Sequence, residues 1–270
     1  MTLKQETTQI VDNPSKYLTL VYGPAGVGKT SWGMQIPGHY FLLTEMGVEG
    51  VEIFGEPVLN WEGFIEKCTE IVEAKEKGFP DQRIITTIVI DTLDNLYEYA
   101  GDWICKNITF AEKGVRVRVA KIEDAPYGKG YKETNKLLII TLNKIMLHGL
   151  GVVLISHTKD REIAWAGQKF PVNMPNLIPS AVEAVVSACG AVGYFAIDEI
   201  VRKNEQGQVE RVEQSRYQYW QPNFLILAKH RLRNFPERLL LEMDKGYTTY
   251  VAAFQETLSK KKDSDNTDKT

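Results

Sequence analysis

Three glycines stand close together near the start of the chain, and a lysine and a threonine follow directly, in the order Gly23-x-x-x-x-Gly28-Lys29-Thr30. Glycines at this density weaken any helix or strand, so the segment suits binding better than packing. A loop of this kind turns several backbone N–H groups inward, where they can bind phosphate oxygens. The pattern predicts a site for ATP, with Lys29 reaching the β- and γ-phosphates and the Thr30 hydroxyl binding Mg²⁺.

The residues around this pattern favour the same prediction. A strand is expected before the loop, over 16–23, and a helix is expected to begin near Lys29, where it adds the positive end of its dipole. The alternative is a plain glycine turn with a surface lysine, which leaves the match at all four positions unexplained. We expect the nucleotide to contact the whole loop, which consists of Gly23, Pro24, Ala25, Gly26, Val27, Gly28, Lys29, Thr30 and Ser31.

Two further polar residues end predicted strands. Asp91 ends the buried-type run 84–91 and is the candidate for holding Mg²⁺ through water, because the strand carries it to the edge where the loop lies. His157 ends the run 151–157 and could donate a hydrogen bond to the γ-phosphate. An ordinary strand-ending aspartate and a structural histidine remain the alternatives.

Hydrolysis also needs a group that orients the attacking water. Thr92 follows Asp91 directly and cannot act as a base, so the candidate is Glu45, which ends the predicted strand 39–45. A solvated loop glutamate is the alternative for Glu45. Glu49 and Glu52 are weaker candidates for the same role.

The elements that must position these residues alternate along the chain. Strands are expected over 16–23, 39–45, 84–91 and 151–157, and helices over 60–78, 95–108, 135–149 and 180–189. The segment 158–180 contains Pro171, Pro175 and Pro179 and is expected to be irregular. A β-hairpin of 191–203 and 209–221 and a strand over 223–231 are expected towards the C-terminus. The order predicts an α/β fold with a doubly wound, mostly parallel sheet and a β-rich C-terminal extension.

The composition of the 270 residues is that of a globular protein, with 43% hydrophobic and 25% charged residues and a formal net charge of −3. Only three cysteines are present, without a Cys-x-x-Cys pair, which fits a reducing cytoplasm and argues against a zinc site. No signal peptide or apolar run of membrane-spanning length is recognised, so no membrane partner is expected. The expected organisation is a polar lead-in over 1–15, an ATPase domain over 16–258 and a disordered charged tail over 259–270.

The phosphate loop, a glutamate after the second strand, an aspartate after the third and a polar residue after the fourth resemble the RecA-like ATPase core. The segment around Lys229 and Arg231 is similar to the Lys-x-Arg element of RecA-like and replicative-helicase-like proteins. The resemblance implies that these two cations act in trans on the nucleotide of a neighbouring subunit, in a ring or a filament. Arg233 and Arg238 are nearby alternatives.

The chain looks most similar to phage-encoded RecA-like ATPases that bind single-stranded DNA and promote annealing or recombination. The resemblance therefore implies single-stranded DNA and a homo-oligomer as partners, a single-strand-binding protein as a further one, and the host cytoplasm as the location. His157 departs from the family pattern, because RecA and replicative helicases usually carry glutamine there. The flanking oligomerisation segments of the recombinase are not recognised either.

Two long segments, 110–133 and 158–175, mix cations with aromatic rings, which suits a flexible single strand whose phosphates and bases are bound together. Their candidate DNA-binding residues are Lys113, Arg116, Arg118, Lys121, Tyr127, Lys129, Tyr131, Lys159, Arg161, Trp165 and Lys169. Acidic residues are interspersed, so a merely solvated surface is the alternative. A P-loop kinase for a nucleoside or nucleotide, with 110–133 as its lid, and an ATP-switched helicase loader are the other functions that the sequence leaves open.

Overall fold

The computed structural model describes residues 11–45, 50–78, 84–165, 167–204, 206 and 208–267. The inner strands of its large sheet are β1 (Leu18–Gly23), β2 (His39–Leu43), β4 (Thr87–Asp91), β7 (Gly151–Trp165) and β9 (Ala191–Lys203). The remaining strands of that sheet are β3 (Gly55–Pro57), β8 (Gln168–Pro175), β10 (Val209–Tyr219), β11 (Lys229–His230) and β12 (Arg238–Leu240). A separate small hairpin pairs β5 (Phe110–Glu112) with β6 (Val115–Val117).

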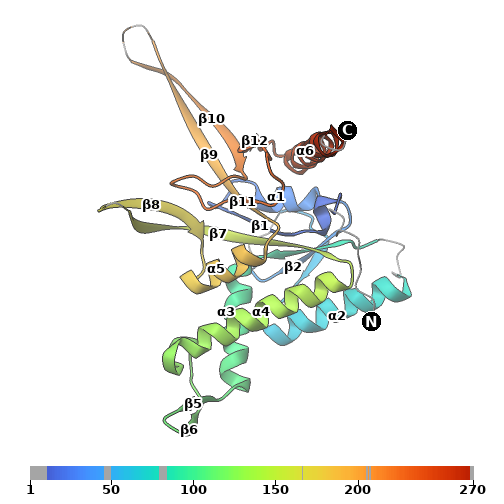
Figure 1. Cartoon of the computed structure of the whole chain (residues 1–270), viewed down its shortest axis with the longest axis vertical. Helices are drawn as coiled ribbons and strands as arrows, with labels where there is room; N and C mark the ends of the chain where they lie inside the picture. Colours follow the sequence, from blue (N-terminus) through green and yellow to red (C-terminus); the bar gives the residue numbers. More distant parts are fainter. Residues whose placement is uncertain are drawn as a thin grey trace.

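The large sheet has the order β12-β10-β9-β1-β7-β4-β2-β3, with β11 beside β9 and β8 beside β7 (Figure 1). The pairs from β9 to β3 are parallel, and β10, β11, β12 and β8 pair antiparallel. This mostly parallel α/β sheet with a β-rich extension confirms the predicted fold class.

Helices cover both faces of the sheet (Figure 1). They are α1 (Lys29–Met34), α2 (Trp61–Lys77), α3 (Leu93–Asn107), α4 (Lys129–Leu147), α5 (Pro179–Ala188) and α6 (Gly246–Thr267), with 3₁₀ turns η1 (Pro14–Lys16), η2 (Ile122–Asp124) and η3 (Pro126–Gly128). Side chains alternate along the strands: Leu20 and Ile90 pack on the side of α2 to α5, and Val21 and Val89 pack on the side of α1 and α6. Strand β4 is buried over its whole length because both of its faces are covered.

Aromatic packing fixes α1, the helix that follows the phosphate loop. The Trp32 ring lies 5.7 Å from Phe195 of β9 and 5.1 Å from Tyr247 and 5.7 Å from Tyr250 of α6, measured between ring centroids. The Gln35 side chain joins the same elements, since its Nε2 donates to the Met243 carbonyl and its Oε1 accepts from the Tyr247 N–H. The C-terminal helix thus stabilises the position of the loop.

Two predictions for the outer parts of the fold are corrected. Residues 158–180 were expected to be irregular, but β7 runs on to Trp165 and pairs with β8 in a hairpin that projects from the sheet (Figure 1). Pro171 and Pro175 fit there because β7 is the only named strand that pairs with β8 among the described residues, and the other edge of β8 forms only the isolated bridge between Asn173 and Ile226. The strand expected over 223–231 is reduced to Lys229–His230, since Ile226 forms only isolated bridges.

The end of the chain is also different from the prediction. The tail expected to be disordered from Ser259 continues α6 as far as Thr267. Tyr250, Phe254 and Leu258 bury the start of this helix, and the Lys260 amine lies 2.7 Å from the Glu256 carboxylate one turn earlier. The hairpin of β9 and β10 is found where it was predicted. In the part of the chain that is described, no helix combines the length and the apolar character that a membrane crossing requires.

Candidate nucleotide-binding site

The phosphate loop leaves the sheet at the carboxyl end of β1, between β7 and β9. Gly23 is needed for close approach, because a Cβ atom there would lie 2.3 Å from the Phe195 carbonyl oxygen. Gly26 and Gly28 have φ angles of 72° and 111°, in the region that favours glycine. Gly28 also caps α1 without a side-chain hydrogen bond, so the first N–H groups of the helix remain available to a ligand.

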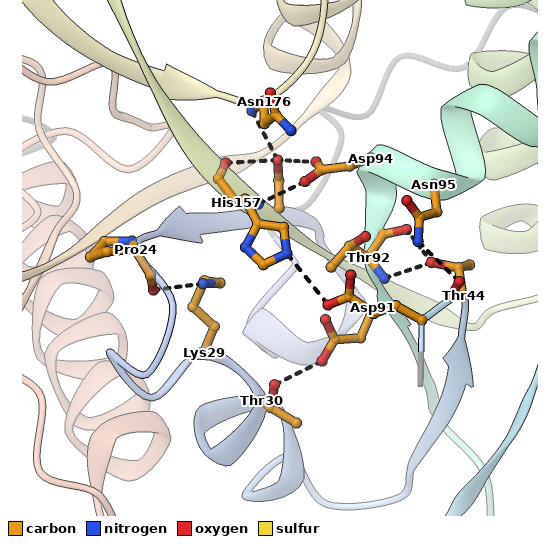
Figure 2. Close-up of polar contacts among 12 residues, drawn as sticks. Pro24, Lys29, Thr30, Thr44, Asp91, Thr92, Asp94, Asn95, His157 and Asn176 are labelled. Atoms are coloured by element: carbon orange, nitrogen blue, oxygen red, sulfur yellow. Dashed lines mark hydrogen bonds and ion pairs between the residues drawn. The ribbon is translucent and has the colours of Figure 1, made fainter. Parts of the chain in front are cut away.

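Lys29 lies inside the curl of this loop (Figure 2). Its Nζ donates to the Gly23 carbonyl at 2.8 Å and to the Pro24 carbonyl at 2.9 Å, and the residue is only 6% exposed. Burial lowers the pKa of Lys29, while the nearby carboxylates of Asp91, Asp94 and Glu45 oppose that shift. An arriving phosphate would relieve the cost of burying this cation, which favours anion binding at the loop.

Thr30 and Asp91 lie side by side, as the motif predicts, with the Thr30 hydroxyl donating to the Asp91 Oδ2 at 2.8 Å. Burial raises the pKa of Asp91, and this hydrogen bond works against the shift. Two adjacent oxygen donors at the edge of a phosphate loop fit Mg²⁺, which prefers oxygen ligands and keeps several waters. Among the described residues, no cluster of three or more His, Cys, Asp and Glu could hold a metal, so phosphate oxygens and water would complete the shell.

Glu45 and His157 meet at the same edge of the sheet. The Glu45 Oε1 lies 3.4 Å from the His157 Nε2, and His157 is paired in register with Gly23 of the phosphate loop. The strand order β1-β7-β4-β2 places β2, and therefore Glu45, beside the strand that ends in Asp91. Of the two weaker candidates, Glu52 is exposed and Glu49 lies outside the described residues.

Thr44 fixes the backbone next to Glu45, a role that the sequence did not reveal. Its Oγ1 accepts from the Thr92 N–H and donates to the Thr92 carbonyl, both at 2.8 Å (Figure 2). The Thr44 carbonyl accepts from the Asn95 Nδ2 at 3.0 Å and from the Tyr99 hydroxyl at 3.1 Å. These bonds join the end of β2 to the start of α3, so Glu45 and Asp91 are held relative to each other.

Asp94 is a second buried acid that the sequence analysis missed. It accepts hydrogen bonds from the Ser156 hydroxyl and, at 3.0 Å, from the His157 N–H. The Asn176 N–H donates to the His157 carbonyl at 3.0 Å, just after β8 ends. Burial raises the pKa of Asp94, and these hydrogen bonds oppose the shift. The network joins the nucleotide site to the base of the β7–β8 hairpin, and its only signal in the sequence is an acid one turn after Asp91.

Lys229 and Arg231 lie at the opposite edge of the sheet from the phosphate loop. The Arg231 N–H donates to the Gly190 carbonyl, and the Gly190 N–H donates to the carbonyl of Leu18, the first residue of β1. Gly23 is five residues further along β1, about 16 Å at 3.3 Å per residue. The Lys229 amine binds the Val186 carbonyl at 2.8 Å and the Ser187 carbonyl at 3.3 Å, at the end of α5.

No described contact places Arg238 or Arg233, the alternatives to these two cations, at the phosphate loop. Arg238 lies 4.7 Å over the Tyr217 ring and 3.8 Å from the Asp198 carboxylate. Arg233 is exposed in the turn that follows β11. The site of a single chain therefore consists of the phosphate loop, Glu45, Asp91 and His157.

The candidate DNA-binding residues fall on two separate projections. Lys113, Arg116 and Arg118 belong to the β5–β6 hairpin and its exit, and Tyr127 is 84% exposed. Several of these cations already bind the protein: Arg118 donates to the Lys106 carbonyl at 2.8 Å, and Lys129 donates to the Ala111 carbonyl at 3.1 Å.

The second projection is the β7–β8 hairpin. It carries Lys159, Arg161 and Lys169, of which Arg161 donates to the Leu177 carbonyl and Lys169 pairs with Glu162 at 2.8 Å. The Trp165 main chain ends β7, but its side chain lies outside the described part of the structure. Both projections expose cations, as a DNA-binding surface would require.

A cleft of about 770 Å³ lies between the bases of the two projections. Lys121 and Tyr131 line it from one side, and His157 and Asn176 line it from the other. Four acids also line it, namely Asp94, Glu98, Asp102 and Glu123. This charge disfavours phosphates inside the cleft, so a nucleic acid would have to lie on the outer sides of the hairpins.

A family model described as an AAA domain matches residues 15–232 of the chain. The match includes the phosphate loop, Glu45, Asp91, His157 and the cations after β11, and it covers most of the described sheet. Among the curated proteins, none matches the chain.

Proposed function

The chain belongs to the AAA domain family of P-loop ATPases, and from this premise we propose that it hydrolyses ATP at the end of β1 and couples hydrolysis to single-stranded DNA. The observation that carries the proposal is the meeting, near Lys29, of the ends of β1, β2 and β4 with the point of β7 that pairs with Gly23. This meeting brings Thr30, Asp91, Glu45 and His157 together. ATP hydrolysis requires oxygen groups that can hold a metal ion, here those of Thr30 and Asp91, and a carboxylate beside the phosphate loop, here that of Glu45.

In this site the backbone of Gly26 to Thr30 and the Lys29 ammonium bind the β- and γ-phosphates. Thr30 would hold Mg²⁺ directly and Asp91 would hold it through water, and the metal supplies charge neutralisation at the phosphates when it is bound. Glu45 orients the attacking water and accepts its proton. His157 contacts the γ-phosphate, and its main-chain bonds to Asp94 and Asn176 connect it to the β7–β8 hairpin.

We infer that the polymer partner is single-stranded DNA in recombination or annealing of the phage type. The cations of the two projections and the exposed Tyr127 ring support this assignment, and the acidic cleft limits it to the outer sides of the projections.

The direct test measures ATP turnover with and without a single-stranded oligonucleotide at low and high salt. We expect stimulation at low salt that falls steeply as salt rises, because each phosphate contact releases counterions. If the oligonucleotide does not change ATP turnover and the protein retains no labelled single strands, DNA binding is contradicted. The proposal that the protein is an ATPase would then remain.

We further propose that the active site is completed in trans, with Lys229 and Arg231 of one subunit acting at the phosphate loop of the next. Their position at the opposite edge of the sheet supports this arrangement, because a head-to-tail neighbour can present that edge to the loop. A cation supplied in this way can contribute about 10³–10⁵ in rate. Since the Lys229 amine already caps α5, Arg231 is the better candidate for the finger.

Mixing two inactive variants tests the trans arrangement. Arg231→Ala should keep ATP binding and lose turnover, and Lys29→Ala should lose binding. Mixed in equal amounts, the two should regain part of the activity, because some interfaces join an intact loop to an intact arginine. The control is each variant alone at the same total concentration. Absence of recovery at every ratio would contradict the trans arrangement.

A small-molecule kinase is the second candidate, and the cleft beside His157 favours it. Its Asn95, Tyr97 and Asn176 side chains could bind the hydroxyl groups of an acceptor next to the γ-phosphate position. The ATPase and the kinase are distinguished by the fate of the γ-phosphate: labelled ATP gives free phosphate in the first case and a labelled nucleoside or nucleotide in the second.

A further inference from the structure

A cavity of about 550 Å³ opens at the edge of the sheet where β1 and β9 begin, away from the phosphate loop. Cationic side chains line it from three elements: Lys16 from η1, Arg231 from the turn after β11 and Lys261 from α6. Its described lining contains no aspartate or glutamate. The charges of Lys16 and Arg231 at one cavity, in a chain of net charge −3, create a local field that attracts anions.

The floor of this cavity is apolar. Leu18 and Leu232 lie beneath it and are only 3% and 5% exposed, so the apolar surface that a ligand could cover belongs to Tyr17 and to Met146 of α4, which are both half-buried. The Tyr17 ring forms one wall and is held edge-on against Phe254 of α6 at 5.4 Å between centroids. An inorganic ion would leave this surface in water, whereas a ligand with a flat apolar body would cover it.

Backbone hydrogen bonds of Gly190 hold Arg231 at the cavity. Arg231 is anchored through its N–H to the Gly190 carbonyl, and Gly190 is anchored to Leu18. A Cβ atom on Gly190 would lie 2.8 Å from the Tyr17 ring, so a side chain at this position would displace the wall. Tyr17 and Arg231 both line the cavity, and burial raises the pKa of Tyr17 while the Arg231 charge opposes this shift.

We propose that this cavity binds an organic phosphate monoester, with its dianion between Lys16 and Arg231 and its apolar body on Tyr17 and Met146. The volume lies within the range of small-ligand sites, and the planar fork of arginine suits phosphate oxygens. The cavity is separate from the phosphate loop of the same chain, and binding there does not depend on hydrolysis. The same chemistry could reach the cavity as a free ligand or as the phosphates of a nucleotide held by a neighbouring subunit, and we assign the free ligand.

Phenyl phosphate is a suitable probe, and calorimetric titration of the Lys29→Ala protein is the test, because that protein cannot present a nucleotide to its neighbours. We expect saturable binding of phenyl phosphate, and much weaker binding of phenol and of inorganic phosphate, since each lacks one half of the interaction. Lys16→Gln and Arg231→Gln, each made in this protein, should weaken binding about tenfold by removing a charge-assisted hydrogen bond. Lys77→Gln is the matched control, because Lys77 is 73% exposed, pairs with Glu73 and is not among the residues that line the cavity.

Binding that neither Lys16→Gln nor Arg231→Gln changes would overturn the site, and so would phenol or inorganic phosphate binding as tightly as phenyl phosphate. Binding that appears only after ATP-loaded wild-type protein is added would assign the phosphate to the neighbouring subunit and overturn the free ligand. Both cavity residues are exposed, so their variants should unfold at the temperature of the parent. The readout is binding and not turnover, so the result is independent of the trans arrangement.

Discussion

Lys29→Ala should weaken ATP binding by about thirtyfold or more, because removing one partner of a buried charge pair costs about 2–5 kcal/mol. Lys29 is the cation enclosed by the phosphate loop, and its Nζ is held by two carbonyls of that loop. Without it the triphosphate meets only backbone N–H groups. Hydrolysis should fall at least as far, since the same charge stabilises the γ-phosphate during transfer.

Thermal unfolding measures this loss without relying on activity. ATP and Mg²⁺ should raise the Tm of the wild-type protein, because a ligand that binds only the folded state stabilises it by mass action. The same concentration should raise the Tm of Lys29→Ala much less, since the weaker binding lowers the stabilisation. Lys77→Ala is the control for removal of an exposed lysine, and it should keep the full shift. A Lys29→Ala protein with the wild-type shift would disprove nucleotide binding at this loop.

The parts of the site that the sequence could predict are those that depend on short patterns. The spacing from Gly23 to Thr30 needs only a strand before it and a helix after it, and β1 and α1 provide both. Asp91 and His157 end runs of apolar residues, and parallel strands carry such ends to one edge. These predictions required no knowledge of which strands are neighbours.

Contacts between distant segments were beyond the reach of such patterns. Thr44 and Asp94 are ordinary polar residues in the sequence, and their roles depend on β2 lying beside β4 and on Ser156 facing α3. Trp32 likewise contacts Phe195 and the aromatic rings of α6, which lie far from it in the sequence and are brought beside it only by the fold. Chain order does not fix these neighbours, because several strand orders satisfy the same alternation of strands and helices.

The projecting hairpin of β7 and β8 was missed for a different reason. Lys159, Asp160, Arg161 and Glu162 are all charged, so no alternation of apolar and polar residues marks them as a strand. Their pairing extends β7 beyond the edge of the covered sheet, where side chains on both faces can remain in water. The end of α6 was missed for a related reason, because its charged residues show no helical pattern of apolar side chains. The packed first half of α6 stabilises the helix, which then continues through these charged residues.

Glu45→Gln should leave ATP binding within about twofold of the wild type and reduce turnover by about 10²–10⁴, the usual contribution of a general base. The substitution keeps the size of the side chain and its contact with His157, but an amide cannot accept the proton of the attacking water. The structure supports the choice of this residue because Glu45 Oε1 lies 3.4 Å from His157 Nε2, and the bonds of Thr44 to Thr92 hold it beside Asp91.

The measurement pairs an ATP titration with a turnover assay on the same preparation. Loss of turnover with intact binding separates the role of Glu45 from that of Lys29, whose replacement should remove both. Glu52→Gln is the matched control, because Glu52 is an exposed glutamate in the segment that follows β2 and should retain full turnover. Normal turnover in Glu45→Gln would assign the orientation of water to another residue. A loss in both variants would instead point to a general effect of removing negative charge near the bound triphosphate, since that charge is the one feature that the two substitutions share.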